Sequence, residues 1–362
     1  MSREQNYSPL DRAIHRIAFS SRAIQLSAAD IEHALYSRQY RDIPTDNPVF
    51  ITSLPRAGTT LLLEIFSRIP GFATHRYRDM PFILAPLLWK RISGRFRKQA
   101  SLKERAHADG MQVGYDSPEA FEEVLWCAHW PKKYRKDCIL TWNTDDTAPG
   151  FRDLFIGHMQ KIIALRAMDQ PGVDRYASKN NANIARIGLL KRLFPKAHIL
   201  VPFRQPVDHA ASMHRQHMNF LSRHVEDPFS KRYMHDIGHF EFGSLHRPIH
   251  FNSRIDPASR GQPDTLDYWL AYWIDTYEHI MQQQEHVMLL SYEYACNHGN
   301  ATLEVFGSLI DPGFSKPPQG LAEIFHSPPG YNMESVIRDS KLLERALALH
   351  ERLLEMSIVK PG

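Results

Sequence analysis

The sequence predicts an α/β fold in which a central parallel sheet is flanked by helices. Two segments carry this prediction. The apolar, β-branched run Val49–Thr52 is followed by a Pro-Arg-Ala-Gly turn and by a helix-forming run from Thr59. A second apolar run, Ile199–Phe203, lies between two prolines and also leads into a predicted helix. In open α/β sheets, ligands bind at the carboxyl ends of such strands.

The turn after the first strand has the composition of a phosphate-binding loop. Backbone N–H groups at a helix start point toward an anion, and the helix dipole favours its charge. Gly58 permits close approach of the backbone, Thr59 and Thr60 supply hydroxyl groups, and Arg56 supplies a planar cation. No Lys-Ser/Thr pair follows Gly58, so the loop lacks the Walker pattern. We therefore expect a phosphate ligand that needs no metal, with an ordinary strand-turn-helix as the alternative.

A second basic group follows the second strand. Arg204 stands at the expected carboxyl end of that strand, and Ser212 lies eight residues further on in the next predicted helix. The two side chains are expected to hold one phosphate together. Two strand ends with separate anion sites imply a ligand that carries phosphates at two separated places.

These segments resemble the motifs of the sulfotransferases, which use 3′-phosphoadenosine 5′-phosphosulfate (PAPS). PRAGTT resembles their 5′-phosphosulfate loop, in the arginine form found in tyrosylprotein and many bacterial sulfotransferases. Arg204 and Ser212 resemble the 3′-phosphate motif. SKNNANIARIGLLKRLFPKAHIL and VMLLSYEYAC are similar to the lysine-containing segment and to the strand that ends in Tyr-Glu, so the resemblance spans roughly residues 48 to 296.

The resemblance implies a P-loop-like three-layer fold, PAPS as donor, 3′,5′-adenosine diphosphate (PAP) as product, and no metal. The residues that it assigns to the donor site are Arg56, Ala57, Gly58, Thr59, Thr60, Arg204, Ser212 and Tyr292. Arg56 would neutralise the departing 5′-phosphate. Lys179 would be a second catalytic cation, and its alternative is a surface lysine at a strand end.

A general base must take the proton of the acceptor. Asp79 is our first choice, since arginine-loop sulfotransferases present a glutamate at a similar interval after the first helix. Glu122 and Glu123 are rivals because they stand among apolar residues, where burial raises a pKa. Glu123 is retained among the expected catalytic residues. His75 and His129 are weaker candidates.

Polar residues near Lys179 and a group of histidines have open roles. Asn180 and Asn183 would either orient the acceptor or cap the following helix. His209, His214 and His217 share one segment, but no HExxH pattern accompanies them. We expect no metal site there.

Composition excludes several classes of protein. The 362 residues are 43% hydrophobic and 23% charged, as in an ordinary globular enzyme. A net charge of +4 is too weak to indicate nucleic-acid binding. Cys127, Cys138 and Cys296 form no disulfide framework, and neither a signal peptide nor a membrane-spanning run is recognisable. We expect a cytoplasmic protein without a transmembrane segment; its oligomeric state is not readable.

The order of predicted elements favours one main domain. Residues 1–46 are expected to form a helical extension, with helices at Leu10–Phe19 and from near Ser27, where Glu32 completes a capping pattern. Residues 47–362 are expected to form a single domain with insertions at about 73–149 and 219–262, the latter a long surface excursion. Further helices are expected at 151–168, Thr265–Gln284 and Asn332–Met356, and strands at Arg175–Ser178 and Val287–Leu290.

The expected function is transfer of a sulfuryl group from PAPS to a hydroxyl or amine by in-line displacement, assisted by a carboxylate base. The mixture of aromatic residues, carboxylates and histidines in the two insertions favours a carbohydrate or another hydroxylated metabolite as acceptor. Trp269 and Trp273 are expected in the core, with a wall of the acceptor site as the alternative. A P-loop-like kinase or ATPase and a non-catalytic nucleotide-binding protein are the competing functions.

Overall fold

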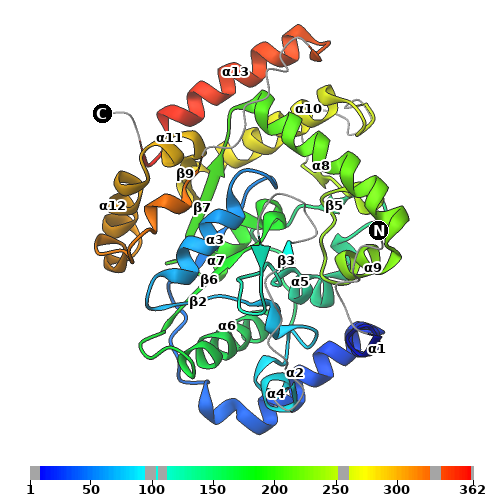
Figure 1. The fold of residues 1–362 in the computed structure, drawn as a ribbon, viewed down its shortest axis with the longest axis vertical. Coiled ribbons are helices and arrows are strands. Elements are labelled where there is room, and N and C mark those ends of the chain that lie inside the picture. The colour runs from blue at the N-terminus through cyan, green and yellow to red at the C-terminus, as the bar shows by residue number, and fades with distance from the viewer. Residues whose placement is uncertain (1–8, 94–102, 105–111, 252–260, 327–335, 360–362) are drawn as a thin grey trace.

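The computed structural model describes residues 9–93, 103–104, 112–251, 261–326 and 336–359. Its centre is a five-stranded parallel sheet with the order β2-β6-β1-β7-β9 (Figure 1). These strands are β1 (Val49–Ile51), β2 (Phe72–Ala73), β6 (Arg175–Lys179), β7 (His198–Phe203) and β9 (Met288–Ser291). Two separate small pairs join β3 (Lys103–Glu104) to β4 (Gln112–Val113) and β5 (Ile139–Leu140) to β8 (Ile249–His250). The predicted fold class is confirmed.

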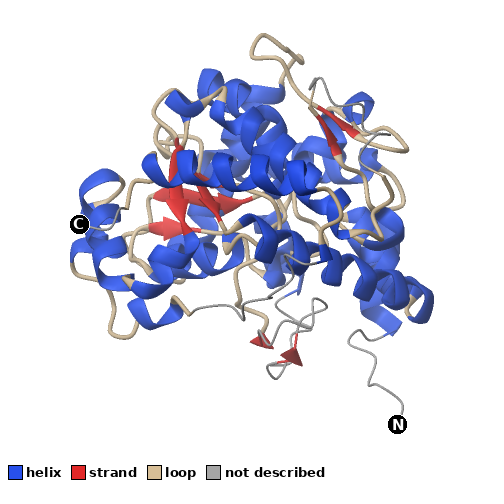
Figure 2. Ribbon diagram, turned by 90° about the horizontal axis from the view of Figure 1, so that it is seen from above, coloured by secondary structure: helices blue, strands red, loops and turns tan. Residues whose placement is uncertain are grey.

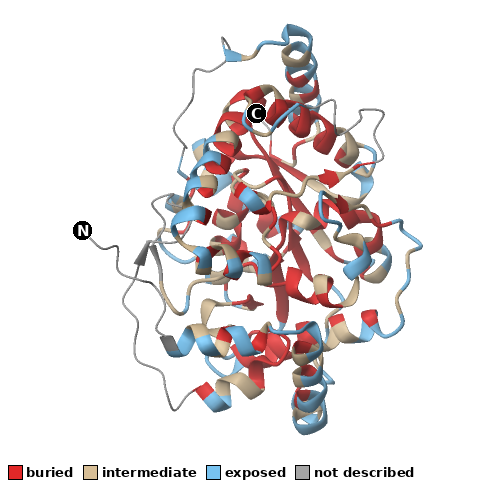
Figure 3. Cartoon of the chain, turned by 90° about the vertical axis from the view of Figure 1, so that its right-hand side faces the viewer, coloured by how far each residue is buried: buried red, intermediate tan, exposed pale blue. Residues whose placement is uncertain are grey.

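Helices cover both faces of the sheet, as Figure 2 shows from above. Val49 and Ile51 of β1 share one hydrophobic cluster with α3 (Thr59–Arg68), α11 (Tyr292–Asn297) and α12 (Gly299–Leu309). Phe50 points to the other face, because side chains alternate along a strand. The cluster on that face includes residues of α6 (Phe151–Ala167), α7 (Ile187–Leu193), α10 (Leu266–Met281) and α13 (Ser340–Glu355). The strands are thus enclosed in a three-layer arrangement (Figure 3).

The remaining helices surround this core. They are α1 (Pro9–Ala18), α2 (Arg22–Tyr36), α4 (Pro86–Ser93), α5 (Glu123–His129), α8 (Pro206–Glu226) and α9 (Pro228–Asp236). None of the helices in the described part of the chain is both long and apolar enough to cross a membrane.

The position of β1 determines what lies at the ligand-binding edge. It pairs with β6 on one side, where Ile51 is opposite Lys179, and with β7 on the other, where Ile51 is opposite Leu200. Because all three strands run in the same direction, their carboxyl ends reach one edge of the sheet. The loop after β1, the end of β6 and Arg204 after β7 therefore meet there.

Several element boundaries differ from the prediction. The second helix begins at Arg22 rather than near Ser27, because the Ser21 hydroxyl oxygen already accepts the Ala23 N–H at 3.1 Å. The last helix begins at Ser340, capped by Asp339, rather than at Asn332. Residues 332–335 lie outside the described residues. The other predicted helices and strands agree with the structure to within about three residues.

The segment 219–262 is not the surface excursion that its lack of periodicity predicted. Helix α8 continues to Glu226, and α9 follows directly. Beyond α9, Phe240, Phe242 and Phe251 are buried. The sequence did not predict their burial, because these residues lie outside helices and strands and so show no periodic pattern of apolar residues. Residues 252–260 of this segment lie outside the described part.

Buried aromatic residues of α10 behave as expected. Trp269 and Trp273 are both fully buried, so the prediction that they belong to the core is confirmed. Trp269 also lines the pocket described below, so the alternative of a pocket wall holds for that residue too.

Glu32 joins α2 to the core and to the first turn of α4 instead of capping the start of its own helix. Its carboxylate is fully buried, lies 3.4 Å from Nζ of Lys161 in α6, and accepts the Leu88 N–H at 2.6 Å. Burial raises the pKa of Glu32, although Lys161 opposes this effect. The pair connects α2 to α6, and Lys161 Nζ also donates to the Ala29 carbonyl of α2 at 3.3 Å.

We predict that Glu32→Ala lowers the free energy of unfolding by about 3 kcal/mol, because Lys161 would remain buried without its counterion. Urea denaturation of the purified variant measures this change. Glu351→Ala, at an exposed position of α13, is the matched control and should change stability by less than about 0.5 kcal/mol. Equal stability of the two variants would contradict the prediction.

Candidate active site

The loop between β1 and α3 is held in a strained conformation by groups from the neighbouring strand and helix. Arg56 has φ +74° and Gly58 has φ +92°. A left-handed backbone at a residue other than glycine costs about 1–3 kcal/mol, so its surroundings must impose it. Arg204 Nη1 donates to the Arg56 carbonyl at 3.1 Å, and His209 Nε2 donates to the Pro55 carbonyl at 2.9 Å. These bonds fix the loop before any ligand is present.

His209 is a structural support of this loop. It is fully buried, and burial together with the nearby Arg204 and Arg56 lowers its pKa to about 3. The ring is therefore neutral at pH 7, with the proton on Nε2 directed at Pro55. From the sequence, His209 was considered only as one of three histidines that do not form a metal-binding pattern, and its contact with the loop was not predicted.

The other two histidines of that group also bind backbone atoms. His214 Nε2 donates to the Asp264 carbonyl at 2.9 Å, and His217 Nδ1 accepts the Gly243 N–H at 3.2 Å. Across the described ranges, no cluster of His, Cys, Asp and Glu has an arrangement that could hold a metal ion.

The two predicted anion motifs are in direct contact. Arg56 Nε donates to the Ser212 hydroxyl oxygen at 3.4 Å, which joins the loop after β1 to α8. Arg204 is 3% exposed, and its Nε makes no hydrogen bond with any residue that the structure describes. Two arginines and a serine therefore converge at the start of α3, and the Nε of the buried Arg204 forms an ion pair with Oε1 of Glu293 at 3.6 Å, which is too long for a hydrogen bond. This arrangement fits a phosphate group.

Tyr292 packs against the loop from the other side. A Cβ atom added to Gly58 would lie 2.3 Å from Cδ2 and Cε2 of Tyr292. The Tyr292 hydroxyl donates to the His326 carbonyl at 3.2 Å, and the Arg204 guanidinium lies 5.6 Å from the ring centre. The assignment of Tyr292 to the donor site stays a prediction. Its observed contacts support the loop.

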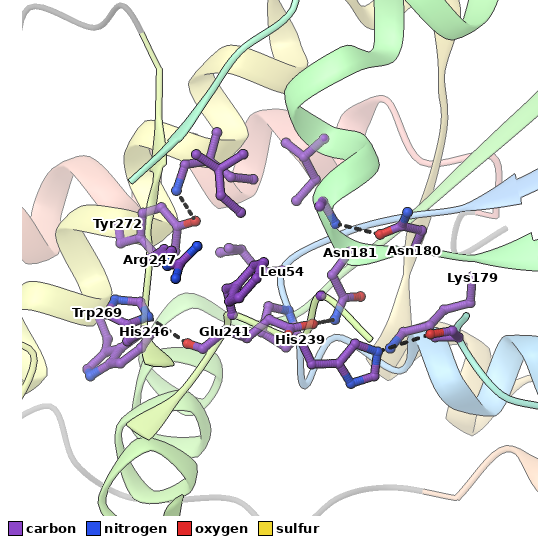
Figure 4. A pocket seen from close by; sticks show the side chains of 18 residues that line it. Leu54, Lys179, Asn180, Asn181, His239, Glu241, His246, Arg247, Trp269 and Tyr272 are labelled. Atoms are coloured by element: carbon purple, nitrogen blue, oxygen red, sulfur yellow. Dashed lines mark hydrogen bonds between the residues drawn. The ribbon is translucent and has the colours of Figure 1, made fainter. Parts of the chain in front are cut away.

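A pocket opens beside the loop at the same edge of the sheet (Figure 4). Leu54 and Pro55 of the loop line it, together with Lys179, the last residue of β6. Most of the remaining wall comes from the residues after β6, from the connection between α9 and β8, and from α10. It includes Asn180, Asn181, Ile184, Phe240, Glu241, His246, Arg247, Trp269 and Tyr272. A molecule in this pocket would lie next to a ligand bound at the loop.

Asn181 connects the pocket to the start of α3. Thr59 Oγ1 donates to Asn181 Oδ1 at 3.2 Å. Asn181 Nδ2 donates to Glu241 Oε1 at 3.1 Å, and both of these residues line the pocket in Figure 4. Glu241 Oε2 has no hydrogen bond within the described part of the chain. Sequence reasoning named neither residue, because Glu241 comes from the aperiodic 219–262 segment and Asn181 stands between two other asparagines.

Those two neighbouring asparagines have structural roles. Asn180 caps the short 3₁₀ helix Asn181–Arg186, with its Oδ1 accepting the Ala182 N–H at 3.1 Å. Asn183 is fully buried and donates to Glu122 Oε1 at 3.0 Å. Capping, one of the two roles considered for them, is therefore found for Asn180.

Glu122 and Glu123 belong to a buried network below the end of β6. Glu123 forms an ion pair with Arg186 and accepts the Asn180 amide N–H at 2.7 Å. Glu122 accepts hydrogen bonds from Ser178, Tyr176 and Asn183. Neither carboxylate is among the described residues that line the pocket. In these surroundings the two carboxylates act as acceptors for buried donors, and Glu123 is the counterion of Arg186. The catalytic role of Glu123 stays a prediction.

Asp79 is also the partner of a buried arginine. It is 2% exposed, and Arg166 Nη2 donates to its Oδ1 at 2.6 Å. Burial alone would raise the pKa of Asp79, but Arg166 and His75 hold it well below the ordinary value. A carboxylate so strongly stabilised as an anion is a weak base. Its role as general base stays a prediction that this environment does not favour.

The two histidines named as weaker bases lie in different surroundings. His75 is buried, with its Nε2 3.0 Å from Nε2 of His158. His129 Nε2 donates to the Pro149 carbonyl at 3.1 Å. Neither is among the described residues that line the pocket.

We predict that Gly58→Ala disables the loop. The substitution forces a side chain into a left-handed position and against the ring of Tyr292, so the loop must shift away from Arg204. Calorimetric titration with PAP, the two-phosphate ligand that the sequence motifs predict, should show an affinity reduced by at least about tenfold, the loss expected when a hydrogen bond to a charged group is broken. Gly157→Ala, where nothing lies within 4 Å of the added carbon, is the control and should bind normally.

Comparison with known proteins identifies the family and the fold. The sequence profile described as the sulfotransferase family matches residues 48–260. No curated protein matches the chain by sequence. Among solved structures, sulfotransferase STF9 from Mycobacterium avium is similar at 12% identity with a TM-score of 0.51, over 96% of this chain and 86% of that one. Sulfotransferase STF1 from Mycobacterium tuberculosis is similar at 11% identity with a TM-score of 0.47, over 95% and 88%.

The similarity to STF9 supports the fold alone. The profile match covers more than half of the chain and includes the loop, Lys179, Arg204 and Ser212. The chain belongs to the sulfotransferase family.

Proposed function

We propose that this sulfotransferase uses PAPS as donor and transfers its sulfuryl group to a hydroxyl or amine of a small-molecule acceptor, in the cytoplasm and without a metal. The observation that carries the proposal is the convergence of Arg56, Arg204 and Ser212 at the start of α3, beside the pocket that contains Lys179. A kinase or ATPase is disfavoured because the loop has no Walker lysine.

The donor would be held by groups on both sides of β1. The N–H groups of Gly58, Thr59 and Thr60 suit the 5′-phosphate, since the first N–H groups of a helix have no intrahelical acceptor. The Ala57 N–H donates to the Leu54 carbonyl at 3.3 Å and would have to exchange this bond for one to the phosphate. Arg204 and Ser212 suit the 3′-phosphate. The hydrogen bond between Arg56 and Ser212 would give way to bonds with the two phosphates.

Sulfuryl transfer needs few groups beyond these. The bond from sulfur to the 5′-phosphate oxygen breaks as a bond from sulfur to the acceptor oxygen forms, and negative charge develops on the phosphate. Arg56 would neutralise that charge. Lys179, which lines the pocket beside Pro55, would act on the bridging oxygen or on the sulfonate.

We assign the general base to Glu241. It lines the pocket next to the loop, and its Oε1 is fixed by Asn181 while Oε2 makes no hydrogen bond with the described residues. Asp79 and Glu123 are instead each bound to a buried arginine. In this proposal the acceptor hydroxyl loses its proton to Glu241, a carboxylate that lines the pocket.

The donor proposal predicts tight, metal-independent binding of PAP. Calorimetric titration should show PAP binding with magnesium chelated, and no comparable binding of ATP with magnesium. Arg56→Ala and Arg204→Ala should each weaken PAP binding by at least about tenfold, because each removes a charge-assisted contact. Preference for ATP and magnesium, or unchanged PAP binding in both variants, would refute the proposed donor site.

The base proposal predicts that Glu241→Gln lowers kcat by about 10²- to 10⁴-fold with PAP affinity unchanged. The glutamine still accepts the Asn181 hydrogen bond, so the loss reports the proton acceptor. The acidic limb of the pH profile of kcat/KM should disappear.

Asp79→Asn is the comparison for this test. The depressed pKa of Asp79 contributes stability above its ordinary pKa of about 4, and that contribution is lost as pH falls below it. Asp79→Asn should therefore be less stable than the wild type at pH 7, with a difference that shrinks below pH 4. Folded Asp79→Asn should keep the acidic limb of the profile. The opposite pattern of activity would assign the base to Asp79.

A further inference from the structure

The wall of the pocket opposite Lys179 contains a cation that the transfer chemistry does not use. Arg247 lines the pocket and is half-buried. Its guanidinium carbon lies 4.1 Å from the ring centre of Phe240, and its backbone N–H donates to the Phe240 carbonyl at 2.8 Å. In Figure 4, Arg247 and Tyr272 lie on one side of Leu54, and Lys179 and Asn180 lie on the other.

Arg247 has no carboxylate partner within the described residues. Two buried arginines near the site do have carboxylate partners, since Arg186 pairs with Glu123 and Arg166 pairs with Asp79. Burial lowers the pKa of Arg247, which indicates that its charge is incompletely solvated. A guanidinium in such a position binds a carboxylate or another oxyanion through two parallel hydrogen bonds.

The wall between the two cations is mainly apolar. Leu54, Ile184 and Ile249 contribute aliphatic surface, and the rings of Phe240 and Tyr272 contribute aromatic surface. Polyols prefer a wall rich in hydrogen-bonding groups, whereas this surface suits an aromatic or alicyclic body. The wall therefore does not favour the carbohydrate acceptor that the composition of the insertions suggested.

We propose that the acceptor is a hydroxylated aromatic or alicyclic molecule that carries an anionic group, and that Arg247 binds this group while the hydroxyl faces Lys179 and Glu241. This inference rests on the proposed function and specifies its substrate class. Arg247 is a specificity-determining residue that takes no part in the transfer itself.

The test compares 4-hydroxyphenylacetate with 4-hydroxyphenylacetamide, which has the same shape without the charge. With PAPS as donor, kcat/KM for the carboxylate should exceed that for the amide by at least about tenfold. Arg247→Met, which keeps the apolar stem on Phe240, should abolish this preference. Arg247→Lys should keep part of it, because lysine retains the charge but not the planar fork.

Two controls separate substrate choice from damage to the enzyme. Arg152→Met, at an exposed position of α6, should keep the full preference. PAP affinity and urea denaturation should be unchanged in Arg247→Met. Equal kcat/KM for the two phenols in the wild type, or faster turnover of glucose than of 4-hydroxyphenylacetate, would overturn the inference.

A binding experiment distinguishes failure of this inference from failure of the proposed function. The two phenols are titrated calorimetrically into protein saturated with PAP. Tighter binding of the carboxylate that Arg247→Met removes supports the anion site even where no sulfuryl transfer is detected. Equal binding of the two phenols, with or without turnover, refutes the anion site.

Discussion

The parallel alignment of β1 between β6 and β7 is the constraint on which the rest of the site depends. Ile51 is opposite Lys179 on one side and Leu200 on the other. A shift of one residue in either pairing would turn the buried side chains of β1 to the wrong face. The same alignment brings the loop, the Lys179 end of β6 and Arg204 to one edge. Fold and chemistry are therefore specified by the same register.

Buried charge maintains that edge at three places. Arg186 pairs with Glu123 below the end of β6, Arg166 pairs with Asp79 beyond β2, and Arg204 binds the Arg56 carbonyl in the loop. Removing one partner of a buried ion pair leaves an uncompensated charge, which is strongly destabilising. Such pairs tolerate few alternative arrangements. The bonds from Arg204 and His209 to the loop carbonyls explain how a loop with a left-handed arginine remains in one conformation.

The sequence allowed the local parts of this design to be predicted. The strand at 49–51, the glycine at the start of α3, and the arginine and serine eight residues apart all appear within short windows, so their pattern is visible in the chain itself. The partners of the carboxylates are not visible in this way. Asp79 meets Arg166 across 87 residues, and Glu123 meets Arg186 across 63. A buried carboxylate can equally be a base with a raised pKa or a counterion, and only the identity of its neighbour decides between them.

Glu241 and Arg247 could not be recognised from the sequence as residues of the site at all. They stand in a segment with no helical or strand period, so nothing in the sequence distinguishes them from exposed residues. They reach the pocket because Phe240 and Phe242 anchor that segment in the core on either side of Glu241. Buried aromatic residues next to Glu241 in the sequence thus hold this carboxylate in the pocket. In related chains, a charged residue that stands between two aromatic residues is therefore a candidate for the pocket wall.

The contact between Gly58 and Tyr292 shows that the loop depends on a residue outside the segment matched by the family profile. The profile match ends at residue 260, whereas Tyr292 follows β9, the strand that pairs with β7 through Leu200 and Phe203. A chain ending at 260 would keep every phosphate-binding motif and lose the ring behind the loop. It would also leave the edge of β7 exposed, which invites pairing between copies. The segment that the family profile matches is therefore shorter than the segment that must be present for the domain to fold. A truncated variant made to study activity has to keep β9 and Tyr292.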